Sequence, residues 1–347
     1  MKSKFKITEY DKIGIINTAF IGDIVISFFL AQNIKNLHHD CKIYFVTNPK
    51  VQDLLPLVQA IDFPVVFDKR NRHKGVKGIL QIANLLREEG VELILAPHRS
   101  LRTTLVSFLS KPKLSVSYST STLRFLYKKV VPYLYKVHEI YRNYQLLSIF
   151  EEYEKIEPLP NVELDFPNVL IARVQNLLGK TFAKKDLVTI SPGSVWKTKR
   201  WHSDGFLFVA KELFKMNKQV VLVGGKEDIE ICDEISRETG AINLAGKTNL
   251  AESLYVIKMS KLLITNDSSP THLASLVKCP TVTIFGPTIP EFGFYPLSPK
   301  SQIIQNENLD CKPCSIHGYN QCPLKHHKCM NEITPERVLN TAIEVLS

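Results

Sequence analysis

Short apolar segments alternate with helix-like amphipathic segments along most of the chain, and this alternation constrains the fold more than any other feature. Continuous apolar strands separated by helices indicate a parallel sheet covered on both faces, because crossover helices bury each strand on two sides. The first series has predicted strands at residues 12–17, 42–47, 64–67 and 91–96, and predicted helices at 22–37, 51–58 and 75–89.

The same rhythm begins again in the second half of the chain. Thr334 and Pro335 there have the pattern of a helix N-cap followed by proline at the first helical position, which predicts a last helix ending near Leu346. The second series has predicted strands at residues 187–190, 219–223, 262–265 and 280–285, and predicted helices near 203–215, near 227–239 and after 269.

The length of the chain supports a division into two domains. At 347 residues it is too long for one ordinary hydrophobic core. We therefore expect two doubly wound, Rossmann-like α/β domains at residues 1–160 and 161–330, facing a central cleft. Residues 151–167 have weak periodicity and are expected to form the linker, and residues 331–347 are expected to hold a helix that packs back on the body.

Positive charge is concentrated in one part of the sequence. Between Lys69 and Arg142 there are fifteen Lys and Arg against four Asp and Glu, whereas the whole chain carries a net charge of +10. This excess favours an anionic partner such as nucleic acid, a phospholipid surface or a phosphorylated glycan. The alternative is a solvated basic surface without a partner.

The sequence offers no stretch of the roughly 18 apolar residues that a membrane span requires, and the N-terminus lacks the pattern of a secretion signal. We expect a cytoplasmic protein. Cys41, Cys232 and Cys279 stand in apolar surroundings and are expected in the core. Four further cysteines are close together, which favours reduced thiols or a structural zinc site over disulfides; they are Cys311, Cys314, Cys322 and Cys329.

Three loops follow predicted strands, where open α/β sheets bind ligands. Residues 17–23 lead to Asp23 at the start of a helix, where the carboxylate is either a helix cap or a reactive group. Residues 191–201 combine hydroxyls, three cations and two tryptophans, which is typical of a phosphate-binding loop. Residues 266–272 form a polar turn that either caps a helix or binds a diphosphate.

The usual nucleotide fingerprints are absent from the sequence. No G-x-G-x-x-G follows the first strand of either domain, Gly224 and Gly225 form only a pair, and there is no Walker lysine loop. This excludes a conventional nicotinamide enzyme and favours a nucleotide-sugar transferase.

Four short motifs follow one another along the chain: I-G-D at 21–23, P-G-x-x-W-x-x-K-R-W at 192–201, D-S-x-P-x-H at 267–272 and F-G-P-T at 285–288. Their order and spacing resemble glycosyltransferase family 9, the bacterial heptosyltransferases of the lipopolysaccharide inner core. The resemblance covers nearly the whole chain. Phe29 stands where the family often has proline, and Ser269 stands where it usually has glycine.

The resemblance implies a GT-B fold, with the acceptor bound by the N-terminal domain and the donor by the C-terminal domain. It implies inverting transfer of heptose from ADP-L-glycero-D-manno-heptose, without a cofactor or catalytic metal. Asp23 matches the proposed base and Lys199 the lysine at the donor phosphate. The other expected donor-binding residues are Ser194, Glu227, Asp267, Ser268, Ser269 and His272.

The implied acceptor is an anionic lipopolysaccharide precursor at the cytosolic face of the inner membrane, so we expect peripheral membrane contact and no nucleic acid. Two alternatives stay open. One is a family 9 enzyme with a different nucleotide-sugar donor, and the other is a basic nucleic-acid-binding protein with a zinc-stabilised tail.

Overall fold

The computed structural model describes residues 5–155, 160–179 and 185–347. The chain divides into two compact units, Met1–Asp165 (unit 1) and Phe166–Ser347 (unit 2). Residues 156–159, in the middle of the predicted linker, lie outside the described residues.

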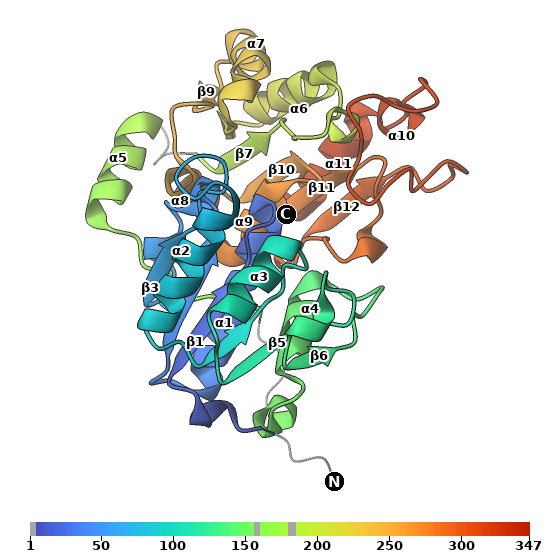
Figure 1. Cartoon of the computed structure of the whole chain (residues 1–347). Coiled ribbons are helices and arrows are strands. Elements are labelled where there is room, and N and C mark those ends of the chain that lie inside the picture. The colour runs from blue at the N-terminus through green and yellow to red at the C-terminus, as the bar shows by residue number, and fades with distance from the viewer. Residues whose placement is uncertain (1–4, 156–159, 180–184) are drawn as a thin grey trace. The chain divides into compact units, whose positions relative to one another are not determined.

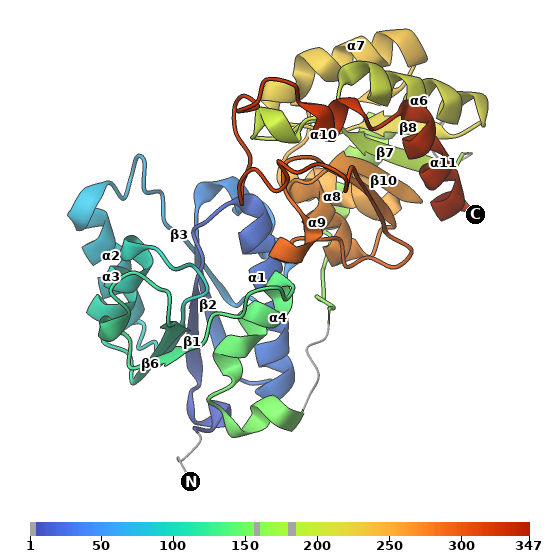
Figure 2. The ribbon, with the colours of Figure 1, turned by 90° about the vertical axis from the view of Figure 1, so that its right-hand side faces the viewer.

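Unit 1 is built on a six-stranded parallel sheet with the strand order β3-β2-β1-β4-β5-β6. Helices α1 and α4 lie on one face of this sheet, and α2 and α3 lie on the other (Figure 2). The strands are β1 (Lys12–Ile16), β2 (Lys42–Thr47), β3 (Phe63–Val66), β4 (Leu93–Leu95), β5 (Leu114–Tyr118) and β6 (Lys129–Val131), and the helices are α1 (Ile21–Leu37), α2 (Gly75–Glu88), α3 (Leu101–Leu109) and α4 (Glu139–Tyr144).

Unit 2 has a second six-stranded parallel sheet, with the order β12-β11-β10-β7-β8-β9 (Figure 1). Helices α6, α7 and α11 pack together on one face, and α5, α8 and α9 on the other. The strands are β7 (Leu187–Ser191), β8 (Gln219–Leu222), β9 (Ile242–Asn243), β10 (Leu262–Asn266), β11 (Thr281–Phe285) and β12 (Gln302–Gln305), and the helices are α5 (Asn168–Leu178), α6 (Ser203–Lys215), α7 (Ile229–Thr239), α8 (Leu250–Met259), α9 (Ser269–Val277), α10 (Lys328–Asn331) and α11 (Pro335–Leu346).

Both sheets have the same topology. Numbered along its own unit, each has the order 3-2-1-4-5-6, the arrangement of dinucleotide-binding domains. The order reverses between β1 and β4 in unit 1 and between β7 and β10 in unit 2. Ligands of such sheets bind at this switch point, beyond the carboxyl ends of the strands.

Helix α1 shows how the sequence determines packing. Its residues from Ile24 to Ile34 are all buried, the polar Ser27, Gln32 and Asn33 among them, so the helix is buried all round instead of having one exposed face. A helix of that kind must be covered on every side. In unit 1 the sheet covers one side of α1 and α4 packs against it.

The structure corrects one predicted element and adds others. Residues 51–58 do not form an α-helix but two 3₁₀ turns, Pro49–Val51 and Leu55–Leu57, each with a proline in its first two positions. Pro56 falls in the interior of the predicted helix, where proline lacks the backbone N–H that an α-helix uses and its ring clashes with the preceding turn. Helices α3, α4, α5 and α8 and strands β5, β6, β9 and β12 were not among the predicted elements.

The last helix begins as predicted. Thr334 is its N-cap and accepts a hydrogen bond from the backbone N–H of Arg337, and proline occupies the first helical position. Val338, Ala342 and Val345 of α11 belong to the core of unit 2. Across the described residues, no helix combines the length and apolar character needed to cross a membrane.

Candidate active site

The switch point of unit 2 brings together two of the predicted loops. Lys199 lies on the 3₁₀ turn η8 (Lys197–Lys199), which follows β7, and Asp267 comes directly after β10. The Nζ atom of Lys199 is 2.6 Å from Oδ2 of Asp267. The hydroxyl of Thr288, which follows β11, donates to the same oxygen at 2.6 Å. Three loops therefore converge on one carboxylate.

His272 lies one turn into α9, close to this ion pair. Its side chain is buried, and burial lowers the pKa of His272 to about 4, with a smaller lowering from Lys199 and an opposing effect of Asp267. The imidazole is therefore neutral at neutral pH and has one N–H to donate. Such a group can hold a ligand oxygen without adding a charge.

Ser268 and Ser269 form the N-terminus of α9, as N-cap and first helical residue. The first backbone N–H groups of a helix have no partner within the helix, and the helix dipole favours an anion there. Ser269 therefore occupies a position that suits a phosphate, although the family usually has glycine there.

Asn266 was not predicted as a site residue, yet it joins the two loops. Its side-chain amide donates to the carbonyl oxygen of Pro192 at 2.8 Å and accepts from the backbone N–H of Trp201 at 3.0 Å. The sequence signal is a buried asparagine at the last position of an apolar strand, where a polar amide needs partners.

Trp201 has a structural role that the sequence did not suggest. It is 1% exposed, and its indole N–H donates to the carbonyl oxygen of Ile333. The two tryptophans of the loop at residues 191–201 therefore lie in different environments. Trp201 lies in the core, whereas Trp196 lies partly exposed beside the loop.

Ser194 lies in the same loop, where its carbonyl oxygen accepts a hydrogen bond from Nε of Arg200 at 2.7 Å. The Arg200 guanidinium is also 3.8 Å from Oδ1 of Asp228. A side chain at Gly193 would meet the Asp228 carboxylate, since an added Cβ would be 2.3 Å from it. A larger residue at that position would displace the Asp228 carboxylate.

Asp228, which follows the predicted donor-binding residue Glu227, is the buried acid of this region. Its Oδ2 accepts from the backbone N–H of Gly225 at 3.0 Å, and its Oδ1 has no hydrogen-bond partner among the described residues. Burial raises the pKa of Asp228, against the lowering by Gly225 and Arg200. Glu227 belongs with Asp228 to the turn η9 (Lys226–Asp228), but its side chain is exposed.

Asp23 lies at the switch point of unit 1, in the first turn of α1. The N-cap of this helix is Phe20, so Asp23 is not the N-cap residue that the alternative interpretation required. Its backbone carbonyl accepts from the Ser27 hydroxyl at 3.0 Å and from the Asn17 side chain at 3.1 Å. These bonds fix the first turn of α1 against the end of β1.

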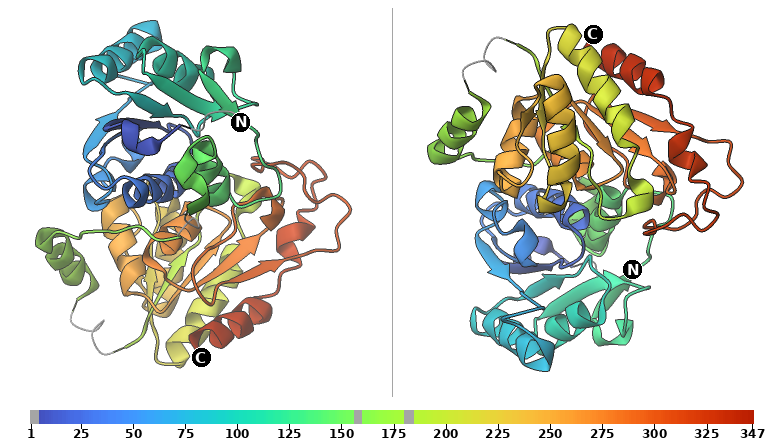
Figure 3. Two further views of the ribbon diagram at one scale, coloured as in Figure 1. Left: turned by 90° about the horizontal axis from the view of Figure 1, so that it is seen from below. Right: turned by 90° about the horizontal axis from the view of Figure 1, so that it is seen from above.

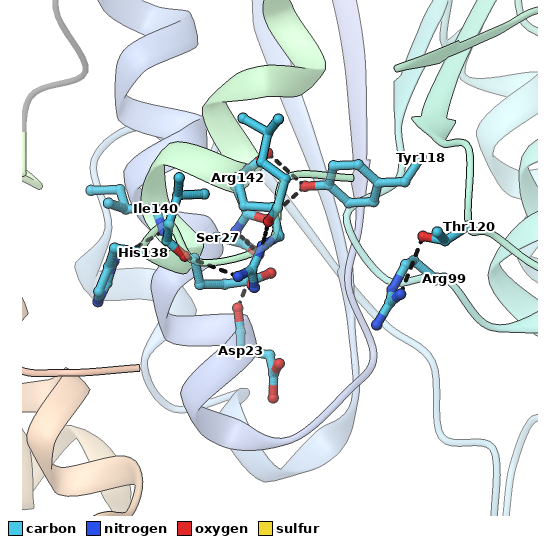
Figure 4. A network of polar contacts seen from close by, with 12 residues as sticks. Asp23, Ser27, Arg99, Tyr118, Thr120, His138, Ile140 and Arg142 are labelled. Carbon is cyan, nitrogen blue, oxygen red and sulfur yellow. Dashed lines mark hydrogen bonds and ion pairs between the residues drawn. The ribbon is translucent and has the colours of Figure 1, made fainter. Parts of the chain in front are cut away.

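A network of polar contacts lies beside Asp23 (Figure 4). Arg142 of α4 forms an ion pair with Glu139 and donates to the carbonyl oxygens of Leu134 at 2.7 Å and Val137 at 2.9 Å. Its backbone carbonyl accepts from the Tyr118 hydroxyl at 2.8 Å. Arg142 is therefore held in a fixed position.

The charges in this network act on one another. Burial raises the pKa of Glu139 to about 7, opposed by Arg142 and reinforced by the negative charge of Asp23. The guanidinium groups of Arg99 and Arg142 lie 4.1 Å and 4.7 Å from the centre of the Tyr133 ring. Cations in these positions are attracted by the face of the ring.

A second polar cluster in unit 1 was also missed by the sequence. Lys69 donates to the carbonyl and hydroxyl oxygens of Thr18 at 2.9 and 3.1 Å, and the Thr18 hydroxyl is 3.1 Å from Nδ1 of His98. Burial lowers the pKa of His98 to about 4, with further lowering by Lys69 and Arg99. Thr18 belongs to the predicted loop at residues 17–23, and Lys69 and His98 lie in the region of excess positive charge.

The seven cysteines are free thiols. Cys41, Cys232 and Cys279 are buried, as predicted. Throughout residues 5–155, 160–179 and 185–347, no three His, Cys, Asp or Glu side chains are arranged to hold a metal ion. Cys311, Cys314 and Cys322 are partly exposed, and Cys329 is buried.

The fold places the chain in a class before any sequence comparison. Two Rossmann-like units of this topology make up the GT-B fold. The structure of a family 9 glycosyl transferase from Veillonella parvula matches with a TM-score of 0.85 and 21% identity, covering 97% of each chain. That of E. coli ADP-heptose lps heptosyltransferase II matches with a TM-score of 0.78 and 21% identity, covering 96% of this chain and 98% of that one.

The sequence comparisons narrow the class to a family. The model of glycosyltransferase family 9 (heptosyltransferase) matches residues 79–326. Lipooligosaccharide heptosyltransferase 2 of Campylobacter jejuni is 30% identical over 296 residues, covering 81% of this chain and 82% of that protein. The chain belongs to glycosyltransferase family 9 and is therefore a glycosyltransferase.

Proposed function

We propose that the protein transfers L-glycero-D-manno-heptose from its ADP derivative to the inner core of a lipopolysaccharide or lipooligosaccharide, with inversion at the anomeric carbon. Family membership supports heptosyl transfer. The observation that carries the donor assignment is the convergence of Lys199, Asp267 and Thr288 at the switch point of unit 2. In open α/β sheets this is where nucleotides bind.

Lys199 is the proposed partner of the leaving diphosphate. As the bond between the anomeric carbon and the phosphate oxygen breaks, negative charge grows on that oxygen. The ammonium, which lies 2.6 Å from Asp267 in the structure, is proposed to stabilise this charge together with the N-terminus of α9. Ser194, Ser268, Ser269 and His272 are proposed to bind the donor around it.

The ribose is proposed to bind near η9. Glu227 is exposed there and remains the proposed hydrogen-bond acceptor for the ribose hydroxyls. Asp228 is buried, and its contact with Arg200 is proposed to support the loop at residues 191–201. The exposed Glu227 is therefore the proposed ligand-binding acid, and the buried Asp228 is the proposed structural one.

Asp23 is the proposed general base. It removes the proton of the acceptor hydroxyl while the acceptor oxygen bonds to the anomeric carbon and ADP leaves. Unit 1 is accordingly the proposed acceptor-binding domain, and its excess of Lys and Arg is proposed to attract an anionic glycolipid at the membrane surface. Unit 2 is the proposed donor-binding domain.

The experiment is incubation of the purified protein with a panel of nucleotide sugars and a heptose-deficient core acceptor, with product masses measured. The expected product is heavier by one heptose and forms only with ADP-heptose. Transfer of another sugar from the panel would establish a different donor. An absence of transfer with every donor on this acceptor would contradict the proposed acceptor.

A further inference from the structure

The segment that contains the four clustered cysteines, Cys311–Cys329 (the cysteine segment), runs from the end of β12 to α10. By the colour bar, the orange-red chain in Figure 3 shows its course within unit 2, and Figure 2 labels α10 at its end. It contains no β-strand and packs against η8, the turn that carries Lys199. The sequence singled out this segment, and the proposed transfer reaction gives it no role.

Thr198 is the centre of the contact between the two segments. Its backbone N–H donates to the carbonyl oxygen of Tyr319 at 3.0 Å, and its hydroxyl donates to the same oxygen at 2.9 Å. In return, the backbone N–H of Tyr319 donates to the Thr198 hydroxyl at 2.8 Å. Thr198 is 4% exposed, so these bonds are shielded from water.

Two further contacts surround this pairing. Nε2 of His327 donates to the carbonyl oxygen of Thr198 at 2.8 Å. The rings of Trp196 and His317 lie nearly parallel, with centroids 6.5 Å apart. The cysteine segment therefore contacts η8 through backbone, side-chain and aromatic groups.

The chain approaches η8 closely at Gly318. Its φ is +100°, and an added Cβ would be 3.0 Å from Cβ of Trp196 and 3.3 Å from Cγ of Lys199. A side chain there would be strained and would press on the stem of Lys199. The glycine allows the cysteine segment to lie directly against the lysine.

The turn itself has few bonds of its own. Within η8 and its flanks, Lys199 N–H donates to Trp196 and Arg200 N–H donates to Lys197. A single 3₁₀ turn of this kind is a weak element, and a lysine stem has many rotamers. A fixed ammonium at Asp267 therefore needs support from outside the turn.

We propose that Thr198 is a positioning residue through which the cysteine segment holds Lys199 at the donor phosphate. This rests on the proposed function, in which Lys199 contacts that phosphate. The bonds to Tyr319 and His327 fix the backbone of η8, and the fixed backbone directs the Lys199 ammonium to the Asp267 carboxylate. Preorganised charge of this kind strengthens ligand binding because little freedom is lost on binding.

The test replaces Thr198 by valine, which keeps the shape of the side chain and removes the hydroxyl. The affinity for ADP, measured by calorimetry, is expected to fall about tenfold, because two hydrogen bonds of the support are lost. Thr198→Ser, which keeps the hydroxyl, is expected to bind ADP within about twofold of the unaltered protein.

Thr239→Val is the matched control. The Thr239 hydroxyl also donates to one backbone carbonyl, that of Ile235, and accepts from one backbone N–H, that of Ala241. It lies at the end of α7 that is remote from the switch point. This variant is expected to lose thermal stability and to keep its affinity for ADP.

A double-mutant cycle establishes whether Thr198 acts through Lys199. In the Lys199→Ala background, Thr198→Val is expected to cause no further loss of ADP affinity. An additional tenfold loss in that background would overturn the proposal, because Thr198 would then act on the nucleotide independently.

The remaining outcomes distinguish the proposed phosphate site at Lys199 from the proposed positioning role of Thr198. If Lys199→Ala weakens ADP binding and Thr198→Val does not, the positioning role is wrong and the phosphate site stands. If Lys199→Ala binds ADP normally, the phosphate site and the positioning role both fail. Should Thr198→Val not fold, His327→Phe removes one bond to η8, and ADP affinity unchanged in that variant would overturn the proposal.

Discussion

The two switch points have the same strand topology but balance their charges differently. In unit 2, Lys199 lies on a short turn and pairs directly with Asp267. In unit 1, Asp23 lies beside a buried acid, Glu139, whose own partner Arg142 is bonded to backbone carbonyls.

This difference shows how the same sheet topology can carry different side chains for the two proposed roles, proton removal in unit 1 and stabilisation of a diphosphate in unit 2. In unit 1 the proposed base, Asp23, lies beside Glu139 and Arg142, which an ion pair and backbone carbonyl oxygens hold in place. In unit 2 the proposed partner of the leaving diphosphate, Lys199, is already held by Asp267. The topology determines the place, and the side chains determine the reaction.

The largest effect is expected from Asp23→Asn. Loss of a general base typically lowers turnover by about 10²–10⁴-fold. ADP affinity should stay unchanged, because the proposed donor site lies in unit 2. Steady-state kinetics with ADP-heptose and calorimetry with ADP measure the two quantities. Near-normal turnover would mean that the two switch points do not divide acceptor and donor chemistry.

Lys199→Ala should affect the proposed donor site at the switch point of unit 2. A charge-assisted hydrogen bond contributes about 1.5–3 kcal/mol, so ADP affinity is expected to fall about 10–150-fold and turnover to fall with it. Lys199→Arg should not restore full activity, because a planar guanidinium cannot occupy the position of a compact ammonium. Unchanged ADP affinity in the alanine variant would place the phosphate elsewhere.

The buried acid of unit 1 should give a pH dependence of stability. The pKa of Glu139 is raised to about 7 in the folded chain, above the value of about 4.3 of an unfolded glutamate. Between these values the folded state binds more protons, so the free energy of unfolding falls as pH rises.

Glu139→Gln should remove this dependence. Denaturant unfolding at pH 5 and pH 8 is expected to show that the unaltered protein loses about 1–3 kcal/mol relative to the variant over this range. A difference between the two proteins that is constant with pH would mean that Glu139 stays ionised throughout, fully balanced by Arg142.

The smallest effect is expected from the basic surface of unit 1. Arg70, Arg72 and Lys74 are exposed. Replacing all three by glutamine should raise the KM for the anionic acceptor about three- to tenfold at low salt, with little change in KM for the donor. At about 1 M salt, where the Debye length is about 3 Å, the difference should largely disappear.

A charge-matched control is available in unit 2. Lys215, Lys258 and Lys261 are also exposed, and their replacement by glutamine removes the same net charge. If this control raises the acceptor KM as much, the total charge of the protein attracts the acceptor and unit 1 has no special role.

The sequence by itself determined the doubly wound class, the position of most strands and the family. Those inferences rest on local patterns: apolar runs for buried strands, Thr334 and Pro335 for the start of α11, and short motifs at strand ends. Such patterns are set by neighbouring residues and do not depend on distant contacts.

The tertiary structure decided which residues meet. Asn266 links the loops after β7 and β10, Asp228 is buried where Glu227 is exposed, and Tyr319 pairs with Thr198 across 121 positions of sequence. The hydrophobic periodicity of the sequence does not predict these arrangements, because they depend on which strands lie next to each other in the folded sheet. Burial then sets the proton affinity of Glu139 and His272, and burial exists only once the chain has folded.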